Sequence, residues 1–139
     1  MEKESKPLDV LIQFLGDINE WESSFFREKI SLIEKGTDTK SCSEYYKKRL
    51  EEILQKHSIK SPKSWARLEG LACGEPTMYD PIRDKMEMDK ESEHSASFIV
   101  EQSIGLEASF KFTLVNSKSG WMIRKKETLR SGKWQESTL

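Results

Sequence analysis

The stretch that decides the fold class is Phe110-Lys111-Phe112-Thr113-Leu114, a turn at 116–120, and then Trp121-Met122-Ile123-Arg124-Lys125-Lys126-Glu127. Apolar and polar residues alternate in its first segment, which is typical of a β-strand with one face in the core. The stretch from Ser97 to Leu129 therefore predicts three consecutive antiparallel strands. It follows a front half with helical periodicity, and this order predicts an α+β roll.

Further strands are predicted on either side of this stretch. Residues 95–104 place Ala96, Phe98, Val100 and Ile104 on one face, and residues 85–89 alternate with Met86 and Met88 inward. Gly105 is expected to take the positive φ of a hairpin.

On the last strand, Lys125 is expected to share a side with Trp121 and Ile123, and Lys126 to lie on the other side with Met122 and Arg124. Residues 67–73 are expected to form a short strand, residues 77–81 a loop, and residues 131–139 a loosely held terminus.

The first half of the chain predicts two helices. Pro7 suits a first helical turn, apolar residues then recur at three- and four-residue steps with Glu22 as the one interruption, and Gly36 supplies a stop. A second apolar stripe includes Tyr46, Leu50 and Leu54, and it ends at His57. We therefore expect two N-terminal helices packed on a curved, mainly antiparallel sheet, a cone-like roll.

Composition gives the class of protein. A chain of 139 residues has the size of one domain, so residues 1–139 are predicted to form a single domain. The start Met1-Glu2-Lys3-Glu4-Ser5-Lys6 has no apolar run after it, and no segment approaches the roughly 20 apolar residues that cross a bilayer. Cys42 and Cys73 are far apart and form no CxxC pair. These features predict a reduced, cytoplasmic setting without membrane association.

Catalytic and cofactor motifs are not found. His57 and His94 lack the spacing of a zinc site, and the chain has no phosphate-binding glycine loop and no nucleophile elbow. We therefore predict no enzyme activity, no metal and no cofactor.

Charge is unevenly distributed along the chain. Residues 61–110 carry 5 Lys/Arg and 10 Asp/Glu, whereas residues 111–139 carry 7 and 2. The basic end does not predict nucleic-acid binding, because Arg124 and Lys126 face away from Lys125 on a strand and the preceding block is acidic. The acidic residues are densest in one stretch, namely Asp80, Asp84, Glu87, Asp89, Glu91 and Glu93.

The chain resembles bacterial immunity proteins with a nuclear-transport-factor-2-like fold, which belong to polymorphic toxin systems. The similar segments follow one another in the expected order: residues 17–22 and 50–54 in the helices, Glu75-Pro76-Thr77-Met78-Tyr79-Asp80-Pro81, residues 102–106, 110–114 and 121–127, and Lys133-Trp134-Gln135. The resemblance implies a single immunity domain that acts as a cytoplasmic, non-catalytic antidote and binds a cognate toxin domain.

The acidic stretch suggests how such a partner would be bound. If the toxin has a basic cleft, Asp80, Asp84, Glu87, Asp89, Glu91 and Glu93 would present carboxylates where phosphates bind, and such complementarity speeds association. The same pattern also fits an ordinary charged edge strand that prevents aggregation. Both interpretations stay open at this point.

Two alternatives use other parts of the roll. A small-ligand binder or enzyme of the same fold would use the cavity between helices and sheet, with Trp65, Tyr79, Asp80 and His94 as candidate lining residues. The same side chains fit buried core positions equally well. A homodimer through the open sheet face is the third interpretation.

Overall fold

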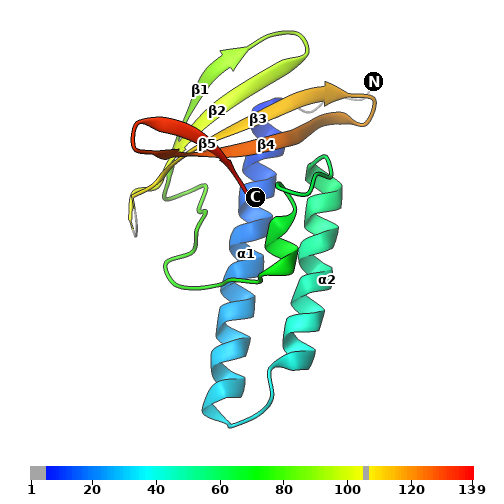
Figure 1. Ribbon diagram of the computed structural model, residues 1–139, viewed down its shortest axis with the longest axis vertical. Helices are drawn as coiled ribbons and strands as arrows, with labels where there is room; N and C mark the ends of the chain where they lie inside the picture. The colour runs from blue at the N-terminus through cyan, green and yellow to red at the C-terminus, as the bar shows by residue number, and fades with distance from the viewer. Residues whose placement is uncertain (1–5, 105–106) are drawn as a thin grey trace.

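Two long helices form an antiparallel hairpin in the computed structural model, which describes residues 6–104 and 107–139. Helix α1 spans Pro7–Glu34 and helix α2 spans Lys40–His57, and they run side by side with their connection far from the sheet (Figure 1). Pro7 stands at the first turn of α1, and Gly36 takes a positive φ of 69° directly after its end. Both predicted helices are confirmed. The hairpin predicted at Gly105 lies outside the described residues.

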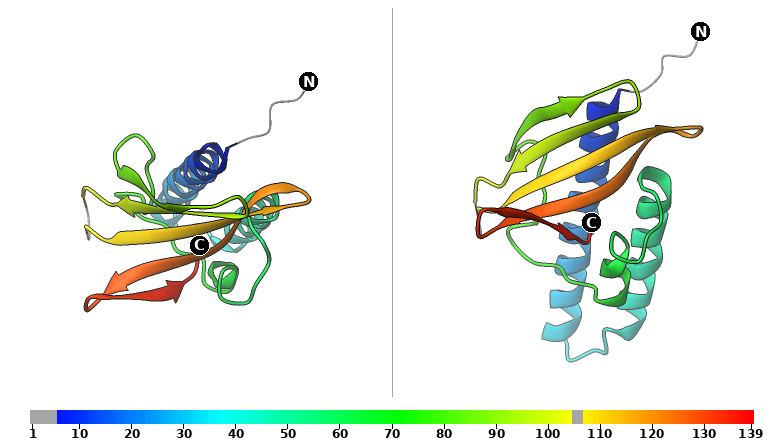
Figure 2. Two further views of the ribbon diagram at one scale, coloured as in Figure 1. Left: turned by 90° about the horizontal axis from the view of Figure 1, so that it is seen from above. Right: turned by 45° about the horizontal axis from the view of Figure 1, so that its top comes forward.

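A five-stranded antiparallel sheet follows the helices. Its strands are β1 (Lys85–Glu91), β2 (Ser95–Glu101), β3 (Ser109–Ser117), β4 (Gly120–Arg130) and β5 (Lys133–Ser137), and they lie in the sheet in sequence order. The sheet is curved and unclosed, and both helices lie on one of its faces (Figure 2). The predicted α+β architecture is therefore confirmed.

The core lies between this face and the helices. Phe14 of α1 packs near Tyr79 and Phe112, with ring centroids 6.3 and 6.4 Å apart respectively. The inward residues predicted on β2 and β3 are buried, with Phe112 and Val100 each 0% exposed. The covered face of the sheet is thus lined by the alternating apolar residues that the sequence indicates.

Four other predictions about segments and inward-facing residues are wrong. Residues 67–73 form no strand, because Ala66–Glu69 is a 3₁₀ helix, η1. Residues 131–139 are not loosely held: they supply β5, and Leu139 is buried and donates its backbone N–H to the Ser64 carbonyl at 3.0 Å. Ile104 lies beyond β2 and is exposed, as is Met88 on β1, although Met88 is in register with the buried Phe98.

A β-bulge corrects the predicted faces of β4. Thr113 is in register with Lys125, but Leu114 is in register with Ile123, so Arg124 is the extra residue. Beyond the bulge the alternation is reversed: Lys125 lies on the outer face, and Lys126, in register with Phe112, lies on the inner face. Lys126 is only 3% exposed. The strict alternation expected from the sequence fails here because one residue is inserted.

Candidate functional site

The acidic residues from Asp80 to Glu93 separate into two groups. Asp80 and Asp84 belong to the turn before β1, and Asp80 accepts the backbone N–H groups of Ile82 at 3.0 Å and Arg83 at 3.2 Å. The Asp84 side chain is only 1% exposed and receives Arg83 Nη2 at 2.8 Å and the Asp80 backbone N–H at 3.1 Å. This hydrogen bond to Asp84 raises the pKa of the Arg83 guanidinium. Both carboxylates are therefore used within the fold.

The second group, Glu87, Asp89, Glu91 and Glu93, lies on β1 and the turn after it. All four residues are exposed, and β1 is an edge strand of the sheet. They do not share one face, since Glu87 is in register with Ile99 on the outer face and Glu91 with Ala96 on the inner face. We call these four residues together with the free edge of β1 the acidic edge.

The predicted cavity residues are not brought together. Tyr79 is 0% exposed and packs within the core, and Trp65 donates its indole N–H to Ser58 Oγ at 2.9 Å. His94 is exposed in the turn between β1 and β2. None of these three residues, nor Asp80, is among the described residues that line the pocket of about 600 Å³ between the helices and the sheet.

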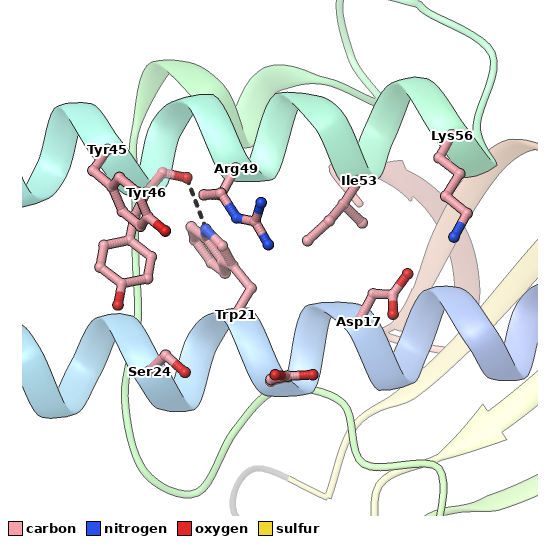
Figure 3. Close-up of a pocket in the computed structure, with 9 residues that line it drawn as sticks. Asp17, Trp21, Ser24, Tyr45, Tyr46, Arg49, Ile53 and Lys56 are labelled. Carbon is pink, nitrogen blue, oxygen red and sulfur yellow. Dashed lines mark hydrogen bonds between the residues drawn. The ribbon is translucent and has the colours of Figure 1, made fainter.

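A groove runs along the helical hairpin between α1 and α2, with a volume of about 440 Å³ (Figure 3). Trp21 lies at its floor and donates its indole N–H to the Tyr46 carbonyl at 2.8 Å. Asp17 Oδ2 lies 2.8 Å from His57 Nε2 at one end. The remaining walls carry charges of both signs, from Glu20, Arg49 and Lys56.

A second pocket, of about 600 Å³, opens between α1, η1 and the inner face of the sheet, and we call it the inner pocket. Its rim carries exposed residues such as Ala72, Pro76 and Arg130. Its floor carries Glu22, Arg67 and Lys126, which are 4%, 4% and 3% exposed. Apolar lining comes from Met78, Ala108 and Phe110, among others. The inner pocket therefore combines an apolar wall with buried charges.

Glu22 and Arg67 form an ion pair at the floor of the inner pocket. Arg67 Nη2 lies 3.4 Å from Glu22 Oε1, and it also donates to the Ala72 carbonyl at 3.1 Å. The Glu22 carboxylate accepts two backbone N–H groups as well, from Met78 at 3.0 Å and from Gly74 at 3.1 Å. Glu22 thus ties the loop 72–78 to α1, which explains the one break in the apolar stripe of that helix.

Lys126 is the functional candidate that sequence reasoning missed. Its ammonium lies 4.2 Å from the Phe110 ring centroid, 4.9 Å from that of Tyr79 and 3.5 Å from Met78 Sδ. Burial, with smaller contributions from the charges of Arg67 and Arg130, lowers the pKa of Lys126 to about 7. No local sequence signal marks the bulge at Arg124, so the sequence places Lys126 on the same side as Arg124, opposite the buried Ile123.

Across residues 6–104 and 107–139, no three His, Cys, Asp or Glu side chains come together in a way that would hold a metal ion. In those same ranges, neither helix has the length and apolarity needed to cross a membrane.

The fold and these sites define a roll of the nuclear-transport-factor-2-like class, and comparisons with known proteins specify it further. A model of the NTF2 fold immunity protein family matches residues 6–138, so the chain belongs to this family. It is also similar to immunity protein RhsIA of Dickeya dadantii (strain 3937), with 26% identity over 137 residues that cover 97% of each chain. No solved structure shows a significant match. The family resemblance predicted from the sequence is confirmed.

Proposed function

We propose that this protein neutralises a cognate bacterial toxin by binding the toxin domain directly, without catalysis. The observation that carries the proposal is the match to an immunity-protein family over residues 6–138. The similar immunity protein of Dickeya dadantii supports it, since the likeness extends over nearly the whole of both chains. Direct binding is stoichiometric and requires only a complementary surface.

The acidic edge is the surface that we assign to the toxin. Three lysines accompany its four carboxylates, namely Lys85 and Lys90 on β1 and Lys111 on β3, which lies 3.9 Å from Asp89, so the edge carries one excess negative charge. Lys85 lies 3.3 Å from Glu87, but both side chains are more than half exposed, so this pair is weak and easily exchanged for a partner's charge. A toxin with a basic cleft would be attracted to this edge and would associate faster.

The free backbone of β1 adds a second binding element. An edge strand presents unpaired N–H and C=O groups, which an extended segment of another protein can pair with. Charged side chains also protect such edges from unwanted pairing, so the edge would favour a basic partner over a neutral one. Carboxylates and an open edge together therefore specify the chemistry of the partner: a protein segment or cleft that is rich in Lys and Arg.

If a gene beside this one encodes a toxin domain, co-expression of that domain, called here the neighbouring toxin, with this protein tests the proposal. We expect growth to be restored and the two proteins to co-purify, whereas an unrelated toxin domain gives neither result. Absence of both rescue and complex formation with the neighbouring toxin would contradict the proposal.

The assignment of the acidic edge has its own test. The triple variant Glu87→Lys, Glu91→Lys, Glu93→Lys reverses the exposed charges, and it leaves the buried Asp84 intact. The matched control is Glu34→Lys, Glu44→Lys, Glu51→Lys, which makes the same change in charge at exposed helical positions. Loss of rescue in the first variant alone supports the acidic edge, and equal behaviour of the two variants overturns it.

A further inference from the structure

The floor of the inner pocket holds more hydrogen-bond donors than acceptors. Both oxygens of the Glu22 carboxylate are engaged, one with Met78 N–H and Arg67 Nη2 and the other with Gly74 N–H. Among the residues that the structure describes, Arg67 Nε and Nη1 have no hydrogen-bond partner although both atoms are buried. These donors lie in a side chain that is 4% exposed.

Lys126 adds three more donors to the same pocket. Lys126 Nζ lies 3.5 Å from the thioether sulfur of Met78, which is a weak hydrogen-bond acceptor. The aromatic faces of Phe110 and Tyr79 stabilise the cation, but they leave its N–H groups without oxygen acceptors. Keeping a buried ammonium group charged in these surroundings costs free energy unless an anion binds beside it.

The charge balance points to a ligand with one negative charge. When Lys126 is protonated, Arg67 and Lys126 contribute two positive charges against the single carboxylate of Glu22, so the floor then carries one excess positive charge. Arg130 at the rim adds a cation where solvent enters. The apolar wall of Met78, Ala108 and Phe110 favours a ligand with an apolar body over a highly charged phosphate.

We propose that the inner pocket binds a small organic monocarboxylate with an apolar body, its carboxylate lying between Lys126 and Arg67 and its apolar part along Phe110 and Met78. The carboxylate supplies the acceptors that the Arg67 and Lys126 donors lack, in charge-assisted hydrogen bonds. This inference is independent of toxin binding, which we assign to the acidic edge.

Calorimetric titration of the whole protein with three probes of equal chain length tests the inference: octanoate, 1-octanol and octylamine. We expect octanoate to bind with one-to-one stoichiometry, octanol to bind about tenfold more weakly or worse, and octylamine not to bind. Octanol that binds as tightly as octanoate would show a merely apolar pocket and overturn the inference. Absence of octanoate binding at millimolar concentration would also overturn it.

Lys126→Met locates the carboxylate, with Lys125→Met as the matched control on the outer face of the same strand. Methionine keeps the apolar stem of Lys126 and removes the buried charge, so we expect octanoate affinity to fall about tenfold or more while octanol binding persists. Lys125 is 39% exposed, and its variant should bind octanoate like the unaltered protein. Equal octanoate affinity in the two variants would overturn the assignment.

The pH dependence of octanoate binding to the unaltered protein tests the same point without any substitution. The groups facing Lys126 are Arg67, Arg130, Glu22 and Tyr79, and burial raises the pKa of Tyr79. Cys73 also lines the pocket, and burial raises its pKa above 9.0. Octanoate affinity should therefore weaken as pH rises through the pKa of Lys126, at about 7, and a flat profile would contradict the inference.

Discussion

The acidic edge and the inner pocket use the same residue types in opposite ways. Glu22 at the pocket floor is 4% exposed, and its carboxylate has three partners, whereas Glu87 on the edge has one weak, exposed pair with Lys85. The buried charges bind other groups of the folded protein, so removing one of them should lower the free energy of unfolding. The exposed charges cost little to change and remain available for a partner. Carboxylates alone therefore do not identify a binding surface; their partners do.

The largest expected effect comes from Glu22→Gln, compared with Glu87→Gln on the edge. Loss of the Glu22 charge leaves Arg67 buried without its ion-pair partner. The side-chain NH2 of the glutamine also replaces one acceptor oxygen, so it opposes the backbone N–H of either Gly74 or Met78. We expect the free energy of unfolding to fall by about 3–5 kcal/mol, against less than about 0.5 kcal/mol for Glu87→Gln. Urea denaturation measures both, and similar values for the two variants would remove the distinction between the regions.

A second comparison, between Asp84 and Asp89, lies within the acidic stretch itself. Asp84→Asn weakens the hydrogen bonds from Arg83 and puts a buried amide donor in place of one acceptor oxygen. We therefore expect the free energy of unfolding to fall by about 2–3 kcal/mol. Asp89 has only a 3.9 Å pair with Lys111 and a hydrogen bond from Ser97, so Asp89→Asn should cost less than about 1 kcal/mol. Thermal unfolding compares the two variants. If Asp89→Asn lowered stability and Asp84→Asn did not, the description of Asp84 as structural and of Asp89 as exposed and weakly paired would be contradicted.

The third prediction concerns how stability depends on pH. The pKa of Lys126 is lowered from 10.5 to about 7 in the folded protein, so between these values the unfolded chain binds more protons than the folded one. Lys126 therefore makes the protein more stable as pH rises from 7 toward 10.5, by about 2 kcal/mol between pH 7 and pH 9. This gain should vanish in Lys126→Met and persist in Lys125→Met, as measured by urea denaturation at both pH values. Identical pH profiles for the two variants would mean that Lys126 does not titrate in this range.

The smallest expected effect on stability is that of the edge variant Glu87→Lys, Glu91→Lys, Glu93→Lys. All three side chains are exposed, so we expect a change within about 0.5 kcal/mol, as for the control at Glu34, Glu44 and Glu51. Circular dichroism with thermal unfolding checks this result. A large loss would show that the edge residues stabilise the fold, and toxin-binding data from this variant could not then be interpreted as a surface effect.

The sequence predicts most of the fold, because its apolar periodicity is strong. The helical stripes end close to Glu34 and His57, and the alternation of Phe110, Phe112 and Leu114 places β3 correctly. The C-terminal residues, which the sequence did not mark as a strand, are held by the pairing of β5 with β4 and by the burial of Leu139. The single-domain organisation and the homodimer stay predictions.

The candidate sites are less predictable than the fold. Glu22 was visible as an interruption of the helical stripe, but its partner Arg67 lies in a segment that was predicted to be a strand. The position of Lys126 depends on one extra residue at Arg124, and a register shift of one residue changes the face of every later side chain. Long-range pairing determines such a shift, so local patterns do not reveal it.

The rate at which the neighbouring toxin domain associates with the protein tests the central claim most directly. It should be measured at low and at high salt for the unaltered protein, the edge variant and the control variant. We expect the edge variant to associate about tenfold more slowly or worse at low salt, with a smaller difference at high salt, and the control to match the unaltered protein. Equal association rates for the edge variant and the unaltered protein at low salt would contradict the claim that the acidic edge binds the toxin.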